Sequence, residues 1–489
     1  MFTARRLTPL IILLAAAAAL LNYHKPALQA GLPQVYSAPA RRDGKPPIIF
    51  IPGILGSRLV NRLNGEAVWP DLKGDGLALP ISSPVLVGNK DDLVATEVIE
   101  EATVNPLLPK VAIYRSLLKN LELYGGYRRG DLARPLPSGD ADTLYVFAYD
   151  WRRDIVESAR ALGRAIEDLK LGLGRPDLRF DIVSHSMGGL VARYYAMYGE
   201  RDVLDDQIPY PDWSGARNLG RIVMIGTPNA GSMTALRVLL RGYSAANVGR
   251  PSSGLLRKIK RELDATRIGP GEVFTAPSIY QLLPAQQQAR FFDGNLNPLP
   301  VELYEAETWR RYKWSAAFDT KIRQRELDGL MNDLGSAAGK AESLRRHTER
   351  EKFLYVALRR AAAFHNSLAA TSPPPDSLRF IFIGGDCIGT LDGAVILNGV
   401  TPRTIFKPSH FPGETGLRRK AAELIFSPGD GLVTRHSLLG HPLNAQSVVS
   451  TAMRSTPVSV AFFCRSHSGL LADAAARNNL LTALLVNQQ

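Results

Sequence analysis

Six short apolar runs, separated by segments with helical periodicity, constrain the fold of this chain more than any other feature. The runs cover residues 46–53, 143–150, 180–186, 221–228, 378–386 and 457–464. Their apolar content is continuous rather than alternating, which is typical of strands buried on both faces of a parallel sheet. Residues 111–126 and 154–172 carry apolar side chains at helical spacing. This alternation predicts an α/β fold with a mostly parallel, doubly wound sheet, whose reactive groups gather at the carboxyl ends of the strands.

Two long stretches interrupt this alternation. Residues 60–110 separate the first strand from the first helix and are rich in turn residues. Residues 233–376 have a mostly helical pattern and separate the fourth strand from the fifth, which is too long an interruption for a loop. The predicted organisation is therefore an α/β core in two parts, residues 31–232 and 377–489, with a helical cap at 233–376.

The first thirty residues have the layout of a secretory signal peptide. A short basic start precedes an apolar run of 12 residues, 10–21, and small residues follow at 27–31. The apolar run is too short to cross a bilayer comfortably as a helix. Residues 1–30 are therefore predicted to be removed on export to the periplasm or the medium, and an uncleaved N-terminal anchor is the alternative.

Charge and cysteine content narrow the functional classes. The net charge is +13, and more than half of it lies in the predicted cap. Because the chain has no arginine-rich tract, zinc-ligand spacing or aromatic RNA-binding signature, nucleic acid is not expected as a partner. A basic surface also suits anionic lipid headgroups. The two cysteines, Cys387 and Cys464, each end one of the last two strands, so they form either one disulfide or two small buried thiols. No residue pattern indicates a metal, and no cofactor is expected.

The segment FDIVSHSMGG, residues 180–189, is the strongest chemical signal in the chain. Ser184, Ser186 and Gly188 match the small-x-Ser-x-Gly pattern of a sharp turn between a strand and a helix, which exposes the central hydroxyl. An apolar run precedes the pattern and a helical segment follows it. Ser186 is therefore predicted to be a catalytic nucleophile, and a helix-capping serine is the alternative.

A nucleophilic serine needs a base and an acid, which follow it in the order Ser, Asp, His in this type of sheet. His467, in the loop after the last apolar run, is the predicted base, with His410, His436 and His441 as alternatives. Asp430 lies in a glycine-flanked turn and is the preferred acid. Asp386, which directly ends a strand, is the other candidate.

The oxyanion formed during acyl transfer needs two donors. The backbone N–H of Met187, directly after the nucleophile, is predicted to be one. Ile54 is predicted to supply the other, because Gly53 and Gly56 let its loop pass close to a substrate. The loop lacks the lysine that a phosphate-binding loop would carry.

Several motifs together resemble the lecithin:cholesterol acyltransferase family, which includes lysosomal phospholipase A2-type and phospholipid:diacylglycerol acyltransferases. In chain order they are FIPGILGSRL (50–59), VWPDL (68–72), FAYDWR (147–152), SHSMGG (184–189), IGTPNAGS (225–232), PSIYQLLP (277–284), GDGLV (429–433) and RSHSGLL (465–471). The resemblance spans residues 46–471 and implies an α/β-hydrolase fold. It also implies a Ser186, Asp430 and His467 triad with Ile54 and Met187 as oxyanion donors. The family's disulfide-closed flap has no counterpart in residues 60–110, which contain no cysteine.

These observations together predict a serine-dependent hydrolase or acyltransferase for lipid acyl esters that contacts a membrane or lipid surface peripherally. Trp69 either borders the acyl pocket or packs in the core. Two alternatives remain: an esterase for soluble or polymeric esters, and a non-catalytic binding protein on a hydrolase scaffold. The sequence does not predict the acyl donor, the acceptor or the oligomeric state.

Overall fold

The computed structural model describes residues 44–70, 76–83, 85–102, 111–244, 267–440 and 459–486. Residues 41–489 form one compact unit by their contacts. The predicted signal peptide, residues 1–30, lies outside the described residues.

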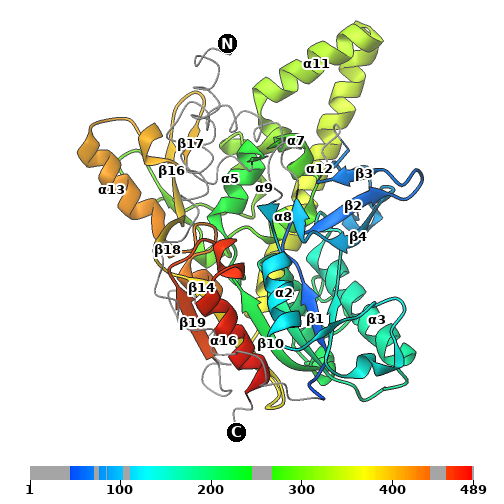
Figure 1. Cartoon of the computed structure of the whole chain (residues 1–489). Helices are drawn as coiled ribbons and strands as arrows, with labels where there is room; N and C mark the ends of the chain where they lie inside the picture. The colour runs from blue at the N-terminus through cyan, green and yellow to red at the C-terminus, as the bar shows by residue number, and fades with distance from the viewer. Residues whose placement is uncertain are drawn as a thin grey trace, which may run out of the picture. The chain divides into compact units, whose positions relative to one another are not determined.

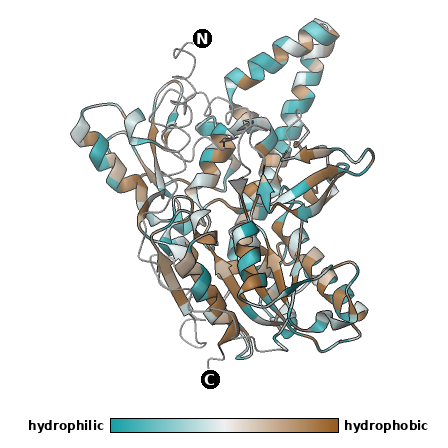
Figure 2. Cartoon of the chain, viewed as in Figure 1, coloured by the Kyte–Doolittle hydropathy of each residue, from teal (hydrophilic) through white to brown (hydrophobic). Residues whose placement is uncertain are grey.

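A seven-stranded sheet forms the centre of this unit, with all its strand pairs parallel (Figure 1). Its order is β19 (Ser459–Phe463), β14 (Arg379–Gly385), β10 (Leu219–Ile225), β9 (Phe180–His185), β1 (Ile48–Ile51), β8 (Thr143–Val146) and β7 (Arg128–Arg129). The six predicted apolar runs are all among these strands. Every residue of β1 and β9 is buried, and the central strands are predominantly hydrophobic (Figure 2). Continuous apolar content thus corresponds to burial on both faces.

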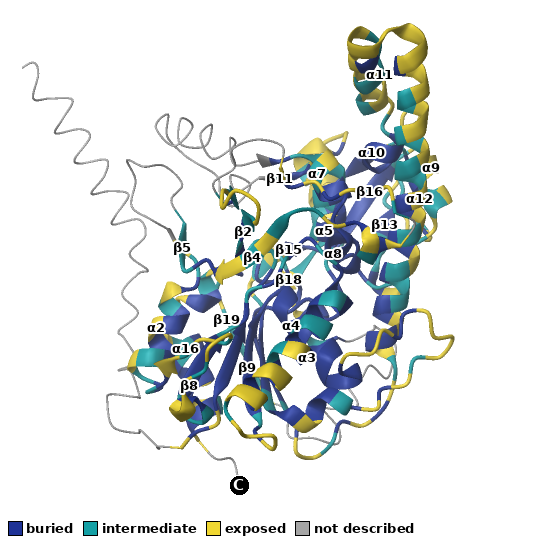
Figure 3. Ribbon diagram, turned by 90° about the vertical axis from the view of Figure 1, so that its right-hand side faces the viewer, coloured by how far each residue is buried: buried dark blue, intermediate teal, exposed yellow. Residues whose placement is uncertain are grey.

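Helices cover both faces of the sheet. The helices α3 (Ile155–Gly172) and α4 (Met187–Tyr198) pack against each other, as do α2 (Arg115–Leu123) and α16 (Ala474–Leu485). Figure 3 shows the two pairs on opposite sides of the central strands. Asp154 caps α3 by accepting a hydrogen bond from the N–H of Val156. Parallel strands buried between two helical layers are the predicted α/β-hydrolase architecture.

Outside the central sheet, smaller strands and helices complete the core. Strands β2 (Ser57–Asn61), β3 (Ala67–Trp69) and β4 (Leu93–Val98) form an antiparallel sheet within the 60–110 region. The helix predicted at 111–126 begins later than expected, because Val111–Ala112 pairs as strand β6 with β5 (Glu101–Ala102). On the carboxyl side, β15 (Ile388–Leu391) pairs with β18 (Phe426–Gly429), and β16 (Gly393–Leu397) pairs with β17 (Arg403–Ile405) and β13 (Arg290–Phe292). The helices of this part are α13 (Thr415–Ile425) and α14 (Arg435–Leu439).

The described part of the 233–376 insertion is mainly helical, with the two-residue strands Tyr243–Ser244 and Arg267–Ile268 (β11 and β12) between its first helices. Its helices are α5 (Met233–Arg241), α7 (Pro270–Phe274), α8 (Pro277–Gln281), α9 (Ala306–Arg311), α10 (Ser315–Phe318), α11 (Thr320–Leu334) and α12 (Ser336–Ala369). The last two form a long hairpin that is largely exposed toward its tip (Figure 3). The strands on either side of the insertion, β10 and β14, are hydrogen-bonded neighbours. Among the described helices, none is long and apolar enough to cross a membrane.

The turn from β9 into α4 depends on a close approach by the loop after β1. Gly188, in the first turn of α4, packs so tightly that an added Cβ would lie 2.5 Å from the carbonyl oxygens of both Ile51 and Pro52. Both obstacles are backbone atoms, which cannot rotate away. The loop and the helix N-terminus can therefore adjoin only if residue 188 is glycine.

We predict that Gly188→Ala destabilises the protein by about 1–3 kcal/mol through overpacking, because the clash exceeds the ~1 kcal/mol that alanine gains over glycine in a helix. Chemical unfolding followed by circular dichroism measures this change. Gly329→Ala in α11 is the matched control, since an added Cβ meets nothing within 4 Å there. This control should be neutral or more stable, and equal stability of the two variants would contradict the packing argument.

Candidate active site

Ser186 lies at the turn between β9 and α4, at the carboxyl end of a central strand. Its backbone angles, φ 52° and ψ −126°, are rarely adopted by residues other than glycine. The N–H of Ser186 donates to the carbonyl of Ile225 over 2.8 Å, which fixes the turn against the end of β10. Although Ser186 occupies the N-cap position of α4, its hydroxyl forms no capping hydrogen bond. The alternative role as a helix cap is therefore not supported.

Asp430 and His467 are brought together from two loops at the same edge of the sheet. Asp430 follows β18, and its Oδ2 lies 2.8 Å from Nδ1 of His467. The other carboxylate oxygen accepts the N–H groups of Leu432 and Val433 at 2.9 and 2.7 Å. The backbone N–H of His467 also donates to the Asp430 carbonyl over 2.9 Å. These contacts orient the carboxylate toward the imidazole ring.

The Asp430–His467 pair adjoins the nucleophile turn through two neighbouring residues. A Cβ added to Gly226, directly after Ile225, would lie 3.0 Å from the His467 ring and 3.2 Å from Oδ2 of Asp430. The His467 ring centroid is 4.7 Å from that of His185, the residue before Ser186. All three predicted triad residues therefore lie in one small region, and each is buried, with no more than 8% of its surface exposed.

The residues considered as alternative acid and bases, where the structure describes them, do not form the Asp430–His467 pair. Asp386 is half-buried, and it is Asp430 rather than Asp386 that bonds to His467. His436 pairs with Asp392, with 3.1 Å between Nε2 and Oδ1, and His410 is exposed. His441 lies outside the described residues.

The two predicted oxyanion donors lie on the segments that meet at Ser186. A Cβ added to Gly53 would lie only 2.8 Å from the Cβ of Ser186, so the loop carrying Ile54 contacts the nucleophile turn directly. Met187 begins α4, where the first N–H groups of a helix have no intrahelical acceptor. In the part of the chain that the structure describes, neither the Ile54 nor the Met187 N–H has an acceptor. Both remain available to a substrate oxygen.

Three aromatic side chains hold the loop of residues 52–55, hereafter the oxyanion loop. The Trp69 indole donates to the carbonyl of Leu55 over 2.9 Å, and the Tyr149 hydroxyl donates to the carbonyl of Pro52 over 2.9 Å. The N–H of Gly53 donates to the hydroxyl oxygen of Tyr114, also over 2.9 Å. Trp69 is 8% exposed and packs edge-on against Trp151, so it supports the loop from within the core. The roles of Tyr114 and Tyr149 could not be predicted from the sequence, because nothing local indicates partners so distant along the chain.

His185 is a neutral neighbour of the predicted base. Burial lowers its pKa well below 6.5, nearby His467 lowers it further, and the backbone of His467 opposes these two effects. Its Nδ1 lies 3.0 Å from the Tyr114 hydroxyl. A cation at this position would disfavour the imidazolium that a catalytic base must form. A neutral His185 avoids that cost.

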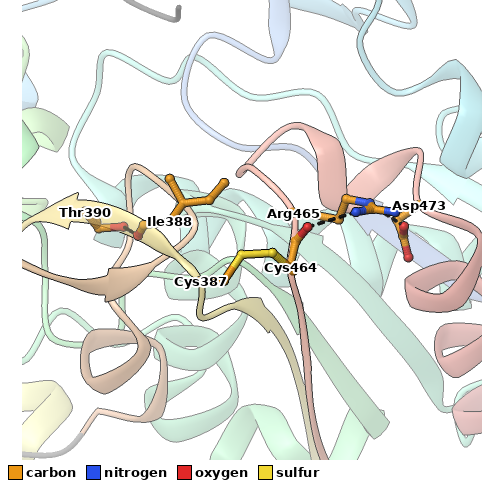
Figure 4. The surroundings of a disulfide bond; sticks show 6 residues. All are labelled: Cys387, Ile388, Thr390, Cys464, Arg465 and Asp473. Atoms are coloured by element: carbon orange, nitrogen blue, oxygen red, sulfur yellow. Dashed lines mark hydrogen bonds and ion pairs between the residues drawn. A yellow bond between two sulfur atoms is a disulfide. The ribbon is translucent and has the colours of Figure 1, made fainter. Parts of the chain in front are cut away.

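A disulfide joins the two strand ends near these loops. Cys387 and Cys464 follow β14 and β19 and are bonded at 2.03 Å (Figure 4). Of the two sequence-based alternatives, the bridge is therefore present. Arg465 extends away from the bridge to an ion pair with Asp473, at 2.6 Å. The cross-link thus lies three residues before His467, and the residue between them that forms the ion pair, Arg465, is tied to the N-cap of α16.

Within the described residues, no cluster of three or more histidine, cysteine, aspartate or glutamate side chains could hold a metal ion. The expectation that the chain needs no cofactor remains a prediction.

The parallel sheet, its helical layers and the residues gathered at its carboxyl edge define an α/β-hydrolase. Residues 91–314 match the family model for lecithin:cholesterol acyltransferase. The resemblance predicted over residues 46–471 is thus confirmed over residues 91–314, which make up 224 of the 489 residues. This match includes Ser186 and ends before Asp430. It supports an ester hydrolase or acyltransferase for lipids in general.

Solved structures resemble the chain at low sequence identity. "The crystal structure of Tle4-Tli4 complex" aligns with a TM-score of 0.54 and 16% identity, covering 90% of this chain and 98% of that one. Bacillus licheniformis lipase BlEst2 aligns with a TM-score of 0.31 and 12% identity, covering 93% of this chain and 55% of that one. Phospholipase PlaB from Legionella pneumophila aligns with a TM-score of 0.22 and 15% identity, covering 58% and 36%. At 16% identity, the likeness to the first of these structures concerns the fold alone. Curated protein sequences yield no significant match.

We predict that replacing both cysteines by serine lowers the free energy of unfolding by about 4 kcal/mol, because the bridge spans 77 positions of the chain. The same loss should appear when the wild-type protein is reduced, since both sulfur-bearing residues are exposed. Urea unfolding with and without reductant measures it, with the double serine variant as the control that reductant leaves unchanged. If reductant does not change the unfolding midpoint of the wild type, the disulfide does not stabilise the part of the sheet that contains β14 and β19.

Proposed function

We propose that the chain is a serine-dependent lipid acyl-ester hydrolase or acyltransferase that works through an acyl-Ser186 intermediate. The observation that carries the proposal is the hydrogen-bonded Asp430–His467 pair beside the Ser186 turn. The unpaired N–H groups of Ile54 and Met187 supply the other feature that acyl transfer requires. The family match supports an acyl ester as the substrate.

In the first half-reaction, Nε2 of His467 takes the proton of the Ser186 hydroxyl while the serine oxygen bonds to the ester carbonyl carbon. The carbonyl electron pair moves to oxygen, where the N–H groups of Ile54 and Met187 stabilise the charge. Asp430 bonds to Nδ1–H of His467, so it holds the required tautomer and stabilises the imidazolium. The bond to the leaving alkoxide then breaks, and the imidazolium proton passes to that oxygen.

In the second half-reaction, water or an alcohol replaces the departed alcohol. His467 takes its proton, the new oxygen bonds to the acyl carbon, and the Ser186 oxygen leaves with the proton returned by the imidazolium. Water yields a fatty acid, whereas an alcohol yields a new ester. The same residues therefore serve a hydrolase and an acyltransferase.

We predict that Ser186→Ala abolishes hydrolysis of phosphatidylcholine and labelling by a fluorophosphonate probe, because the nucleophile is removed. Asp430→Asn should lower kcat about 10⁴-fold through the wrong imidazole tautomer. Product analysis of phosphatidylcholine vesicles, with and without a sterol or diacylglycerol, gives the rates and separates hydrolysis from transfer.

Asp386→Asn is the matched control, because Asp386 also follows a strand end but is not bonded to His467. It should retain wild-type kcat. Full activity in Ser186→Ala would overturn the serine mechanism, and absence of labelling and turnover in the wild type would favour a binding protein on a hydrolase scaffold. Activity confined to monomeric esters would instead favour an esterase for soluble substrates.

We further propose that the α11–α12 hairpin, residues 320–369, contacts the lipid surface. It carries ten lysines and arginines against six acidic residues. Several of these acidic residues form ion pairs within the hairpin. Glu326, for example, pairs with both Arg346 and Arg350. The exposed basic side chains without an acidic partner in the described part of the chain are Lys321, Arg323, Arg325, Lys340 and Lys352. Near the tip, Leu334 and Leu344 are 53% and 66% exposed. Exposed leucines on a hairpin that also carries cations without an acidic partner suit an anionic interface.

We predict that the double variant Leu334→Ser/Leu344→Ser binds anionic vesicles at least about tenfold more weakly, since each leucine loses more than 1 kcal/mol of apolar burial. Wild-type binding should also weaken as salt is raised, because the Debye length shortens. Vesicle co-sedimentation measures both effects. Leu171→Ser/Ile208→Ser, at two exposed positions outside the hairpin, is the control that should bind normally. Equal loss in both double variants would contradict docking through the hairpin.

The exported location predicted from residues 1–30 stays a proposal. The Cys387–Cys464 bridge supports it, because disulfides persist in oxidising compartments such as the periplasm and the extracellular medium.

A further inference from the structure

Tyr114, just before α2, connects the oxyanion loop to the nucleophile turn. Its side chain is 2% exposed. The hydroxyl oxygen accepts the Gly53 N–H over 2.9 Å and lies 3.0 Å from Nδ1 of His185. One hydroxyl thus bridges the residue before Ile54 and the residue before Ser186.

The direction of these hydrogen bonds follows from which of the three groups, the Gly53 N–H, the Tyr114 phenol and the His185 ring, carries a proton. Burial raises the pKa of Tyr114, so the phenol keeps its proton. The Gly53 N–H can only donate, which leaves the phenolic O–H in need of an acceptor. Nδ1 of neutral His185 is the acceptor within reach, and a buried hydroxyl without one would cost free energy. The Gly53 N–H therefore donates to the Tyr114 oxygen, and the Tyr114 O–H donates to Nδ1 of His185. These two bonds form one hydrogen-bond chain.

This hydrogen-bond chain crosses the close contact between the oxyanion loop and the nucleophile turn. A Cβ on Gly53 would lie 2.8 Å from the Ser186 Cβ and 3.1 Å from Nδ1 of His185, and one on Gly56 would lie 2.9 Å from the Tyr114 hydroxyl oxygen. The loop is thus confined between the tyrosine and the nucleophile turn. Trp69 and Tyr149 bind carbonyl groups of the same loop, but of the three side chains Tyr114 alone also bonds to the nucleophile turn.

We propose that Tyr114 and His185 are a positioning pair that sets the distance between the oxyanion loop and Ser186. This inference rests on the proposed serine mechanism. The pair touches no reacting atom in that mechanism, since the donors are the N–H groups of Ile54 and Met187. It acts by holding the Ile54 N–H at the correct distance from the Met187 N–H, so that both can reach the same oxyanion.

Small displacements at such a site are costly. Loss of one oxyanion donor lowers kcat about 10²–10³-fold, and a misplacement of about 1 Å has comparable effects. The donors act on charge that develops only in the transition state, so a shifted loop should lower kcat and leave KM nearly unchanged. A purely structural role would instead reduce the number of active molecules.

The test uses the full chain with Tyr114→Phe, which removes the bridging oxygen and keeps the ring. We expect kcat for a short-chain p-nitrophenyl ester, normalised to fluorophosphonate-labelled sites, to fall at least about tenfold. KM should stay within about threefold, because the ground-state contacts are kept. Affinity for an alkyl trifluoromethyl ketone, which forms a tetrahedral adduct, should fall by the same factor as kcat.

Tyr145→Phe is the matched control. Tyr145 is fully buried, and its hydroxyl donates to the Gly139 carbonyl, outside the site. The control should keep wild-type kcat and ketone affinity even if its stability falls.

Variants of His185 test the second hydrogen bond of this series, from Tyr114 to His185. His185→Asn keeps a polar atom near the position of Nδ1 and should retain most of kcat, whereas His185→Leu should match Tyr114→Phe. The double variant Tyr114→Phe/His185→Leu should be no worse than either single one, because both break the same link.

A Tyr114→Phe enzyme whose kcat per labelled site and ketone affinity equal those of Tyr145→Phe would overturn the positioning role. Should Tyr114→Phe fail to fold, equal kcat in His185→Asn and His185→Leu would overturn it instead. A wild-type protein that neither hydrolyses the ester nor takes the label would refute the proposed function, and the positioning role would fall with it.

Discussion

The contact between the loop after β1 and the turn after β9 is the constraint on which the rest of the site depends. β1 and β9 are adjacent parallel strands in register, with Ile51 beside Ser184, so their following loops must leave the sheet side by side. Gly53 and Gly188 remove the side chains that would keep them apart. Ser186 accepts a strained backbone at the same point, with φ of 52°. The surrounding hydrogen bonds and packing hold this arrangement in place.

The predicted base follows β19 in the other half of the central sheet, and the predicted acid follows β18, which lies outside that sheet. β10, β14 and β19 run parallel to β9 and end at the same edge, so loops after three strands converge on one region. The Asp430 carboxylate is fixed by two backbone N–H groups before it meets His467. The disulfide then ties the ends of β14 and β19. The order of the strands, rather than any local sequence, thus brings the acid and the base to the nucleophile.

Polar groups in this buried region are mostly neutral or paired. His185 beside His467 stays uncharged because burial lowers its pKa, and Tyr114 stays protonated because burial raises its pKa. The Asp430 carboxylate is hydrogen-bonded directly to His467. Among the described residues, five exposed cations without an acidic partner lie on the α11–α12 hairpin, away from this buried region. The proposed lipid contact and the proposed acyl transfer therefore use different parts of the molecule.

The central strands, the nucleophile turn and the glycines around it could be predicted from the sequence, because burial on both faces and a sharp turn leave local signatures. The sequence favoured Asp430 over Asp386 as the acid, because Asp430 lies in a glycine-flanked turn and within a motif that resembles the family, but it could not place either carboxylate beside His467. Three features became evident only in the folded chain: the bond between Asp430 and His467, the pairing of Cys387 with Cys464, and the position of Tyr114 between the two loops. Tyr114 lies 61 and 71 positions from its partners and the cysteines 77 from each other. Such contacts exist only once the order β19-β14-β10-β9-β1 is formed, because strand order, and not proximity along the chain, brings these residues together.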